Sequence, residues 1–280
     1  MSGRLINVED GLIKPLLALL LKDKTTGENI IWATDTHPVF MSEKDILLHS
    51  EAIRPRVEKS LDEQAARTKK KAEVFTPTWV CNRMNDNIDK TAKRKTWKEY
   101  VDSRILEITC GEAPFLVQRY DTVTGEPIPL KDRAGLLDRK LKAIGKNTCT
   151  RKEWVEWAIR AFESSYGYEY QGDNLLIARI NLLLTFIDYY KDRWEKKPDE
   201  KLLRQITNKI VWNIWQMDGL KDIVPLGKPY EEYKQLSLFD TDDIAGKRSE
   251  WEENKSVPCR IYDWRKGRSI IFMKLKEIYL

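Results

Sequence analysis

The chain has 280 residues, of which 41% are hydrophobic and 33% charged, with a formal net charge of +5. This composition can bury a sizeable core, so we expect a globular protein of one large domain or one and a half. The four cysteines are far apart and form no Cys-x-x-Cys pair, and there are only two histidines, so neither a disulfide framework nor a metal site is indicated.

Residues 1–72 are predicted to form a helical N-terminal section. Residues 9–22 have the pattern of a buried helix, and Ser42 opens a Ser-Glu-Lys-Asp segment that resembles a capping box, beginning a second helix that runs toward Lys71. The apolar run at 16–21 is too short to span a bilayer, and the acidic residues before it argue against a signal peptide. We therefore expect a cytoplasmic protein with no membrane partner.

Residues 73–230 alternate between β-rich and helical segments. The predicted strands are 104–109, 166–170 and 209–215, and the predicted helices between them are 153–162 and 174–190. This alternation predicts an α/β fold with a parallel, doubly wound sheet. Residues 231–257 read as a polar linker, followed in 258–280 by a strand at 259–264 and a closing helix at 269–280.

Four segments of the α/β region occur in the order expected of a nucleotide-type cofactor site. They are EVFTP at 73–77, ILEITCGEAPFL at 105–116, GYE at 167–169 followed by ARINL at 178–182, and NIWQMDGL at 213–220. Ligands of parallel sheets bind outside the carboxyl ends of the strands. Glu107 ends the first predicted strand, and Gly111 allows the backbone to approach a ligand closely. Glu169 ends the second strand, where a carboxylate can accept hydrogen bonds from two ribose hydroxyls.

Together these segments resemble the adenine-N6 DNA methyltransferases that use S-adenosylmethionine, of the type found as modification subunits of restriction systems. The resemblance covers residues 70–230 and implies a Rossmann-like methyltransferase sheet. It implies that Glu107 binds the methionine ammonium, that Glu169 binds the ribose and that Asp218 binds the adenine ring. It further implies that Phe75 and Thr76 cover the methionine end, with DNA as the substrate and no metal involved.

The sequence departs from the family pattern in two places. Ile108 and Ala113 stand where a proline and a second glycine are usual, and we expect the methyl group of Ala113 to crowd the cofactor. Catalysis in the family needs Asn-Pro-Pro-Tyr or a close variant, whose asparagine binds the target amino group and whose aromatic ring stacks on the flipped base. The nearest equivalent here, PLGKPY at 225–230, retains only Pro229 and Tyr230 as catalytic candidates. We therefore expect a degraded catalytic motif and a partner subunit that supplies target recognition.

The polar linker contains an apolar pentapeptide between acidic flanks. It reads QLSLF and consists of Gln235, Leu236, Ser237, Leu238 and Phe239. Such flanks favour an exposed segment. The pentapeptide resembles the motif that binds the bacterial DNA sliding clamp, in which the glutamine anchors by hydrogen bonds and the leucines and phenylalanine enter two apolar pockets. The resemblance implies the clamp as a partner; the alternative is a short amphipathic strand or a strip of core.

Three basic clusters suit contacts with DNA phosphates, although each is equally typical of a solvated helix face. They lie at 67–71, 93–95 and 265–268.

Three functions remain open from the sequence. The first is a DNA adenine methyltransferase or modification subunit brought to replicating DNA by its clamp peptide. The second is a methyltransferase-derived binding module, without transfer chemistry, that occupies the clamp or recruits a partner to it. The third is a structural subunit with a vestigial cofactor pocket.

Overall fold

The computed structural model describes residues 4–33, 39–71, 73–92, 95–226 and 256–275. Short 3-10 helices occur at η1 (Lys14–Leu16), η2 (Ser50–Ala52) and η3 (Arg56–Glu58). The α-helices are α1 (Leu17–Leu20), α2 (Glu43–Leu48), α3 (Leu61–Lys71), α4 (Thr78–Ala92), α5 (Trp97–Asp102), α6 (Leu136–Asn147), α7 (Arg151–Glu163), α8 (Gly172–Trp194) and α9 (Glu200–Asn213). The strands are β1 (Ile105–Glu107), β2 (Ser165–Glu169), β3 (Ile214–Gln216), β4 (Arg260–Asp263) and β5 (Arg268–Ile271).

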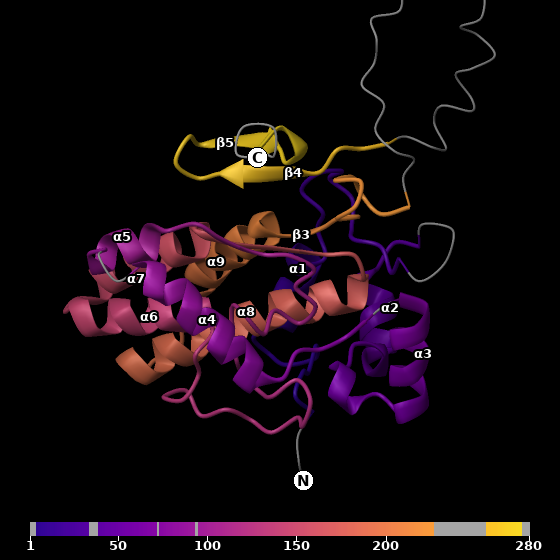
Figure 1. The fold of residues 1–280 in the computed structure, drawn as a ribbon, viewed down its shortest axis with the longest axis horizontal. Helices are drawn as coiled ribbons and strands as arrows, with labels where there is room; N and C mark the ends of the chain where they lie inside the picture. The colour runs from indigo at the N-terminus through magenta and orange to yellow at the C-terminus, as the bar shows by residue number, and fades with distance from the viewer. Residues whose placement is uncertain (1–3, 34–38, 72, 93–94, 227–255, 276–280) are drawn as a thin grey trace, which may run out of the picture.

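A small parallel sheet in the order β1-β2-β3 lies at the centre of the chain (Figure 1). Glu107 pairs with Gly167, and Glu169 pairs with Gln216, so the carboxyl ends of all three strands meet at one edge. The mixed α/β fold with parallel strands is therefore confirmed for this three-stranded sheet. That the sheet belongs to a Rossmann-like methyltransferase stays a prediction.

The two faces of the sheet are covered differently. Ile214 packs into a large helical core with side chains such as Trp154 and Phe186 of α7 and α8. The neighbouring Trp215 points to the other face, into a smaller cluster with Phe272 and other residues of the β4–β5 hairpin region. Figure 1 shows this hairpin on the side of the sheet away from α8. Alternation of side chains along the strands thus makes a three-layer arrangement of helices, sheet and hairpin.

Helix α8 joins the layers through a buried arginine. Arg179 has no exposed surface and donates hydrogen bonds to the carbonyl oxygens of Ile214 (2.8 Å), Leu20 (2.6 Å) and Lys22 (3.0 Å). Burial lowers the pKa of Arg179 to about 10. Since these carbonyls lie at the end of α1 and the start of β3, one side chain of α8 satisfies groups from two other segments. In the described ranges, no helix is both long and apolar enough to cross a membrane.

The helices of the N-terminal section are shorter than predicted. The helix expected at 9–22 is limited to η1 and α1, because Asp10 closes a turn by accepting from the backbone N–H of Leu12 (2.8 Å). The cap at Ser42 is confirmed, since its hydroxyl accepts from the N–H of Asp45 (3.0 Å). The helix that it opens ends at Leu48, however, and α-helical structure toward Lys71 resumes only in α3, after the short 3-10 helices η2 and η3. Pro55 lies between the two helices and cannot occupy a helix interior.

The strand predicted at 209–215 is wrong over its first five residues, which continue α9. Asp199 caps this helix by accepting from the N–H of Leu202 (2.9 Å), and the apolar positions 202, 203, 206 and 210 then follow helical spacing. The β-branched residues at 210 and 211 favoured a strand locally, but their burial on α9 overrides this preference.

The closing helix predicted at 269–280 is also wrong over its first residues, because 268–271 form β5 and pair with β4, the strand that the sequence did predict. Gly267 makes the turn with φ +63°, a conformation that glycine adopts without strain. The pairing of Tyr262 with Ser269 places the second strand alongside the first.

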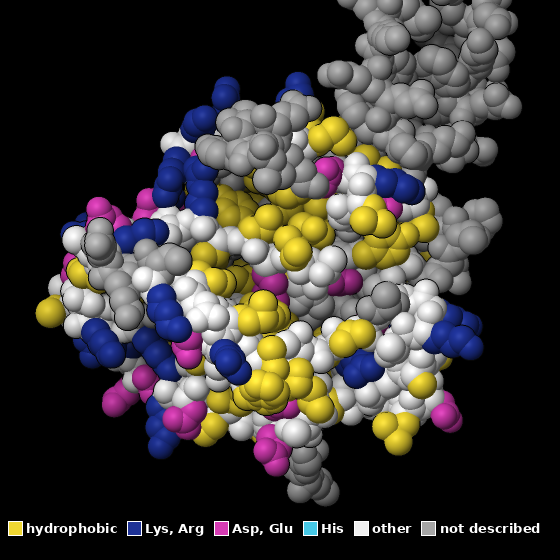
Figure 2. All heavy atoms as spheres, viewed as in Figure 1, with side chains coloured by type: hydrophobic (Ala, Val, Ile, Leu, Met, Phe, Trp, Pro, Cys, Tyr) yellow, Lys and Arg dark blue, Asp and Glu magenta, His cyan; other side chains and the backbone are white. Residues whose placement is uncertain are grey.

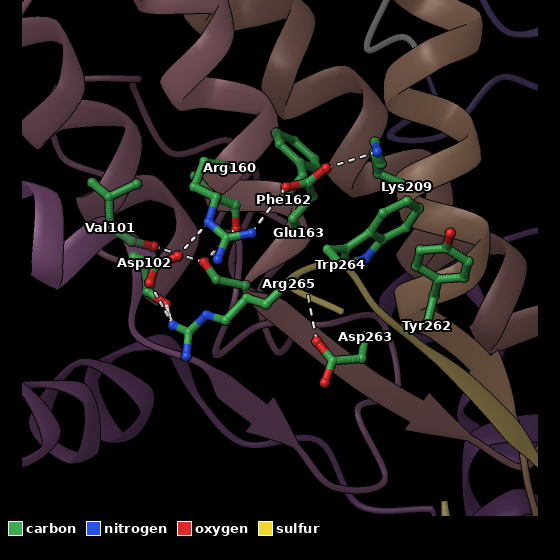
Figure 3. A network of polar contacts seen from close by, with 12 residues as sticks. Val101, Asp102, Arg160, Phe162, Glu163, Lys209, Tyr262, Asp263, Trp264 and Arg265 are labelled. Atoms are coloured by element: carbon green, nitrogen blue, oxygen red, sulfur yellow. Dashed lines mark hydrogen bonds and ion pairs between the residues drawn. The ribbon is translucent and has the colours of Figure 1, made fainter. Parts of the chain in front are cut away.

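The hairpin is held against the helices by a network of charged and aromatic contacts (Figure 3). Asp102 at the end of α5 accepts hydrogen bonds from Arg160 and Arg265. Lys209 of α9 pairs with Glu163 (2.7 Å) and lies 3.6 Å from the ring centroid of Trp264. The Trp264 indole N–H also donates to Asn213 Oδ1 (2.8 Å). The turn of the hairpin is thus fixed to α5, α7 and α9 together.

Replacing Trp264 with Ala should lower the free energy of unfolding by about 2 kcal/mol, because it removes a cation–π contact, a hydrogen bond and ring packing on Tyr262. Urea unfolding monitored by circular dichroism measures the change. Lys266→Ala is the matched control on the same turn, where the exposed side chain should contribute less than about 0.5 kcal/mol. Equal stability of both variants would contradict the anchoring role of Trp264.

Candidate functional site

A cavity of about 1080 Å³ opens at the carboxyl ends of β1 and β2. Five of the six predicted cofactor residues line it: Phe75, Thr76, Glu107, Gly111 and Glu169. Figure 2 shows a hollow in this face of the molecule, with acidic side chains inside it and hydrophobic side chains around it. The volume is at or above the upper end of the usual range for small-molecule sites, so the cavity has room for a nucleoside cofactor.

Glu169 joins the ends of the two strands. Its Oε2 accepts a hydrogen bond from the backbone N–H of Gly111 (2.8 Å), and its Oε1 accepts from the N–H of Gln171 (3.0 Å). Burial raises the pKa of Glu169, while these two backbone hydrogen bonds act in the opposite direction. The carboxyl group therefore fixes the loop after β1 against the beginning of α8.

The carboxyl group of Glu107 also accepts hydrogen bonds from backbone N–H groups. Its two oxygens accept from the N–H groups of Phe115 (3.2 Å) and Leu116 (3.1 Å). Burial raises the pKa of Glu107 to about 8, the two backbone hydrogen bonds lower it, and the nearby Glu169 raises it. At neutral pH the side chain is thus largely protonated, which makes it a weak partner for an ammonium group.

The loop after β1 takes an unusual backbone path. Thr109, Gly111 and Ala113 have φ values of +45°, +54° and +64°. At Gly111 an added Cβ would lie 3.4 Å from Phe75 Cε1, so glycine permits both this conformation and the close approach of the aromatic wall.

Ala113 is fully buried, packs into the helical core and is not among the described residues that line the cavity. Our expectation that its methyl group crowds the cofactor is therefore wrong. The backbone of Ala113 is in the left-handed region, which an alanine adopts at a cost on the order of 1 kcal/mol.

The wall opposite the strands is built by the helical N-terminal section through buried charges. Arg67 of α3 pairs with Glu73 (2.6 Å) and with Asp173 at the start of α8 (2.8 Å), and Lys59 also pairs with Asp173 (3.0 Å). These contacts place the 73–76 segment beside the loop after β1, and Arg56 lies 5.6 Å from the ring centroid of Phe75. From the sequence, Arg67 was included in the basic cluster at 67–71 and Glu73 in the segment at 73–77, but it was not predicted that the two residues pair with each other or with Asp173.

Asp218 is not placed with the other five predicted residues. It lies two residues beyond β3, where its carboxylate accepts from the N–H of Leu220 (3.0 Å) and is 3.6 Å from Lys221 Nζ. Strand β3 ends at Gln216, whose side chain bonds to the backbone of Ile31 instead of facing the cavity. Tyr170 lines the cavity, and its pKa is raised mainly by its own burial and also by the nearby charge of Asp218. Asp218 therefore affects the cavity through its charge.

The basic clusters are distributed over different parts of the structure. Lys69, Lys70 and Lys71, at the end of α3, line the cavity, and Lys71 Nζ donates to Gln171 Oε1 (3.1 Å). Burial lowers the pKa of Lys71, as does the charge of Arg67. The cluster at 265–268 lies on the hairpin, whereas most of the cluster at 93–95 is outside the described residues.

Two sets of predicted residues also lie outside the described part of the chain. These are the catalytic candidates Pro229 and Tyr230, and the clamp peptide at 235–239. The described flanks of that segment meet, since the N–H of Val224 donates to the carbonyl of Val257 (3.0 Å) and the N–H of Cys259 donates to the carbonyl of Asp222 (3.0 Å). Among the described histidine, cysteine, aspartate and glutamate side chains, no group of three or more could hold a metal ion.

The stability of the wild-type protein should fall as the pH rises because Glu107 must lose its proton, and Glu107→Gln should remove this dependence. The unfolded carboxyl titrates near 4.5 and the folded one near 8, so between these values the folded state holds the extra proton and its stability falls as the pH rises. From about pH 5 to about pH 8 the variant should gain about 2 to 4 kcal/mol relative to wild type, at about 1.4 kcal/mol per pKa unit. Urea unfolding of both proteins across this range gives the difference, which separates Glu107 from other buried acids.

Glu200→Gln is the control for this experiment, because its carboxylate is exposed and pairs with Arg204 on the surface of α9. Its pH profile should run parallel to wild type. A pH-independent difference for Glu107→Gln would show that the carboxyl titrates normally in the folded protein.

Comparison of the whole chain with protein-family models, with curated proteins and with solved structures found no match. The chemistry of the site therefore has to be argued from its own geometry. The cavity combines three buried acids, a close backbone approach at Gly111 and a lysine-lined mouth.

Proposed function

We propose that this chain binds S-adenosylmethionine as an adenine-N6 DNA methyltransferase-like protein and docks on the bacterial sliding clamp. The observation that carries the proposal is that five residues, chosen from three separate sequence motifs, line one cavity at the carboxyl ends of adjacent parallel strands. This is where ligands bind in open α/β sheets. A random set of residues from positions 75 to 169 would not converge in this way.

The cavity suits the parts of the proposed cofactor. Glu169 lies at the end of β2, where its carboxyl oxygens keep further lone pairs for the ribose hydroxyls beyond the two backbone N–H groups that they already accept. Phe75 and Thr76 form the wall beside Gly111, as expected for the methionine end. Asp218 is set apart from this lining, so in this proposal the adenine ring lies near Tyr170 and Asp218 acts only at a distance.

DNA is the proposed substrate and the clamp the proposed partner. The lysines at 69–71 supply positive charge at the mouth of the cavity, where phosphates of a bound duplex would lie. The QLSLF peptide belongs to a segment whose described flanks are hydrogen-bonded to each other, so the two flanks lie at one place on the described part of the chain. Tethering to the clamp would raise the local concentration of the protein at newly made DNA.

A second candidate function is supported by the absence of Asn-Pro-Pro-Tyr from the 280 residues. Gly227 stands at the position of the asparagine and offers no side-chain acceptor for the target amino group. A protein without this group, acting alone, would bind cofactor and clamp without transferring a methyl group. Transfer then requires a partner subunit, and without one the chain is a binding module.

Glu169→Ala should weaken S-adenosylmethionine binding at least about tenfold, since it removes the acceptor for the ribose hydroxyls and frees the loop after β1. Isothermal titration calorimetry of the purified protein gives both dissociation constants. Glu200→Ala, an exposed glutamate on α9, should bind as wild type does. Wild-type protein that shows no binding at millimolar ligand would overturn the cofactor proposal.

Replacing Leu238 and Phe239 together with Ala should abolish binding to an immobilised bacterial sliding clamp, because both side chains are expected to fill its apolar pockets. Surface plasmon resonance measures the loss, and thermal unfolding should be unchanged. Ile244→Ala removes an apolar side chain from the same segment and should retain clamp binding. A double variant that unfolds would instead identify the two residues as core.

A further inference from the structure

Glu73 is a buried acid that lines the cavity, and one of its carboxyl oxygens accepts no hydrogen bond from the described residues. Its side chain is 6% exposed, and its Oε2 accepts from Arg67 Nε (2.7 Å) and from Asn174 Nδ2 (3.1 Å). Its Oε1 has no hydrogen-bond partner in the described part of the chain. Arg56 Nε is 3.9 Å from this oxygen, which is beyond hydrogen-bonding distance.

This oxygen distinguishes Glu73 from the other acids that line the cavity. Both oxygens of Glu107 and both oxygens of Glu169 accept backbone N–H groups. A buried carboxylate oxygen without a donor costs free energy, so native structures supply one from protein, water or ligand. Because Glu73 lines the cavity, a ligand can provide the missing donor.

The surroundings of Glu73 indicate which ligand group fits. Arg67 forms an ion pair with Glu73, and a carboxylate oxygen of this kind is suited to a cationic donor. Lys71 lines the same cavity and offers a positive charge to a carboxylate. A carboxylate acceptor and an ammonium group in one cavity complement the two charges of an amino-acid zwitterion.

We infer that Glu73 Oε1 accepts a hydrogen bond from the α-ammonium of the ligand's amino-acid moiety. The inference rests on the proposed cofactor and assigns to Glu73 the role that the family resemblance implies for Glu107. It agrees with the position of Glu73 in the same segment as Phe75 and Thr76, which form the wall expected at the methionine end.

The test compares two nucleosides that differ in the amino-acid group. S-adenosylhomocysteine carries the ammonium, whereas 5′-methylthioadenosine lacks the whole amino-acid moiety. Calorimetry with the full chain should show that Glu73→Gln weakens the first ligand about tenfold or more, as for a hydrogen bond to a charged group, and changes the second less than about twofold. Glu107→Gln is the matched control and should change the affinities for the two ligands by the same factor.

The outcomes separate this inference from the proposal on which it rests. Wild-type protein that binds neither nucleoside overturns the proposed function and the inference with it. Wild-type binding with an equal change for both ligands in Glu73→Gln, or with a selective loss in Glu107→Gln, overturns the inference alone. Should Glu73→Gln fail to fold, Glu73→Asp keeps the charge, withdraws the oxygen by one methylene and is judged by the same comparison.

Discussion

The arrangement of the cavity depends on a set of buried charges that joins the helical N-terminal section to the start of α8. Asp173 pairs with Lys59 and Arg67, and Arg67 also pairs with Glu73. Burial by itself raises the pKa of Asp173, but the two cations hold it below its ordinary value. Removal of any one partner leaves an uncompensated charge in the interior, which typically costs about 3 to 5 kcal/mol. The set therefore acts as a unit that holds α3 and the 73–76 segment in place.

These charges matter because α3 contributes nothing to the hydrophobic core. None of its residues is buried, and Leu61 at its beginning is 82% exposed. A helix of this kind gains little from packing, so its position follows from Arg67 and from the chain on either side. One wall of the cavity is thus fixed by electrostatics, whereas the floor is fixed by the sheet. A ligand that engages this wall would stabilise the N-terminal section in proportion to its affinity.

The sequence identified the parts of the fold that depend on local patterns. The runs that end at Glu107 and Glu169 are strands, and the cap at Ser42 is present, because periodicity and capping are encoded within a few residues. The segment at 209–213 was assigned to a strand because its β-branched residues are common to strands and buried helices. The pairing of Arg67 with Asp173 had no sequence signal, because residues 106 positions apart meet only in the folded chain. The position of Asp218 was missed because the chain turns after β3, where the N–H of Asp218 donates to the carbonyl of Ile223 (2.8 Å), and this turn was not predicted.

The cost of the cavity bears on the choice between the proposed functions. Positive φ at Thr109 and Ala113 costs on the order of 1 kcal/mol each, and Glu73 and Glu107 add the cost of buried carboxyl groups. A clamp-binding peptide needs none of these features, since its contacts are confined to five residues. In a protein with a vestigial pocket, these features would lower the stability without serving any function, and apolar residues at the same places would make the protein more stable. A ligand that donates a hydrogen bond to Glu73 Oε1 would offset part of this cost. These costs therefore favour the proposal that the cavity binds a ligand over the proposal that it is a vestigial pocket.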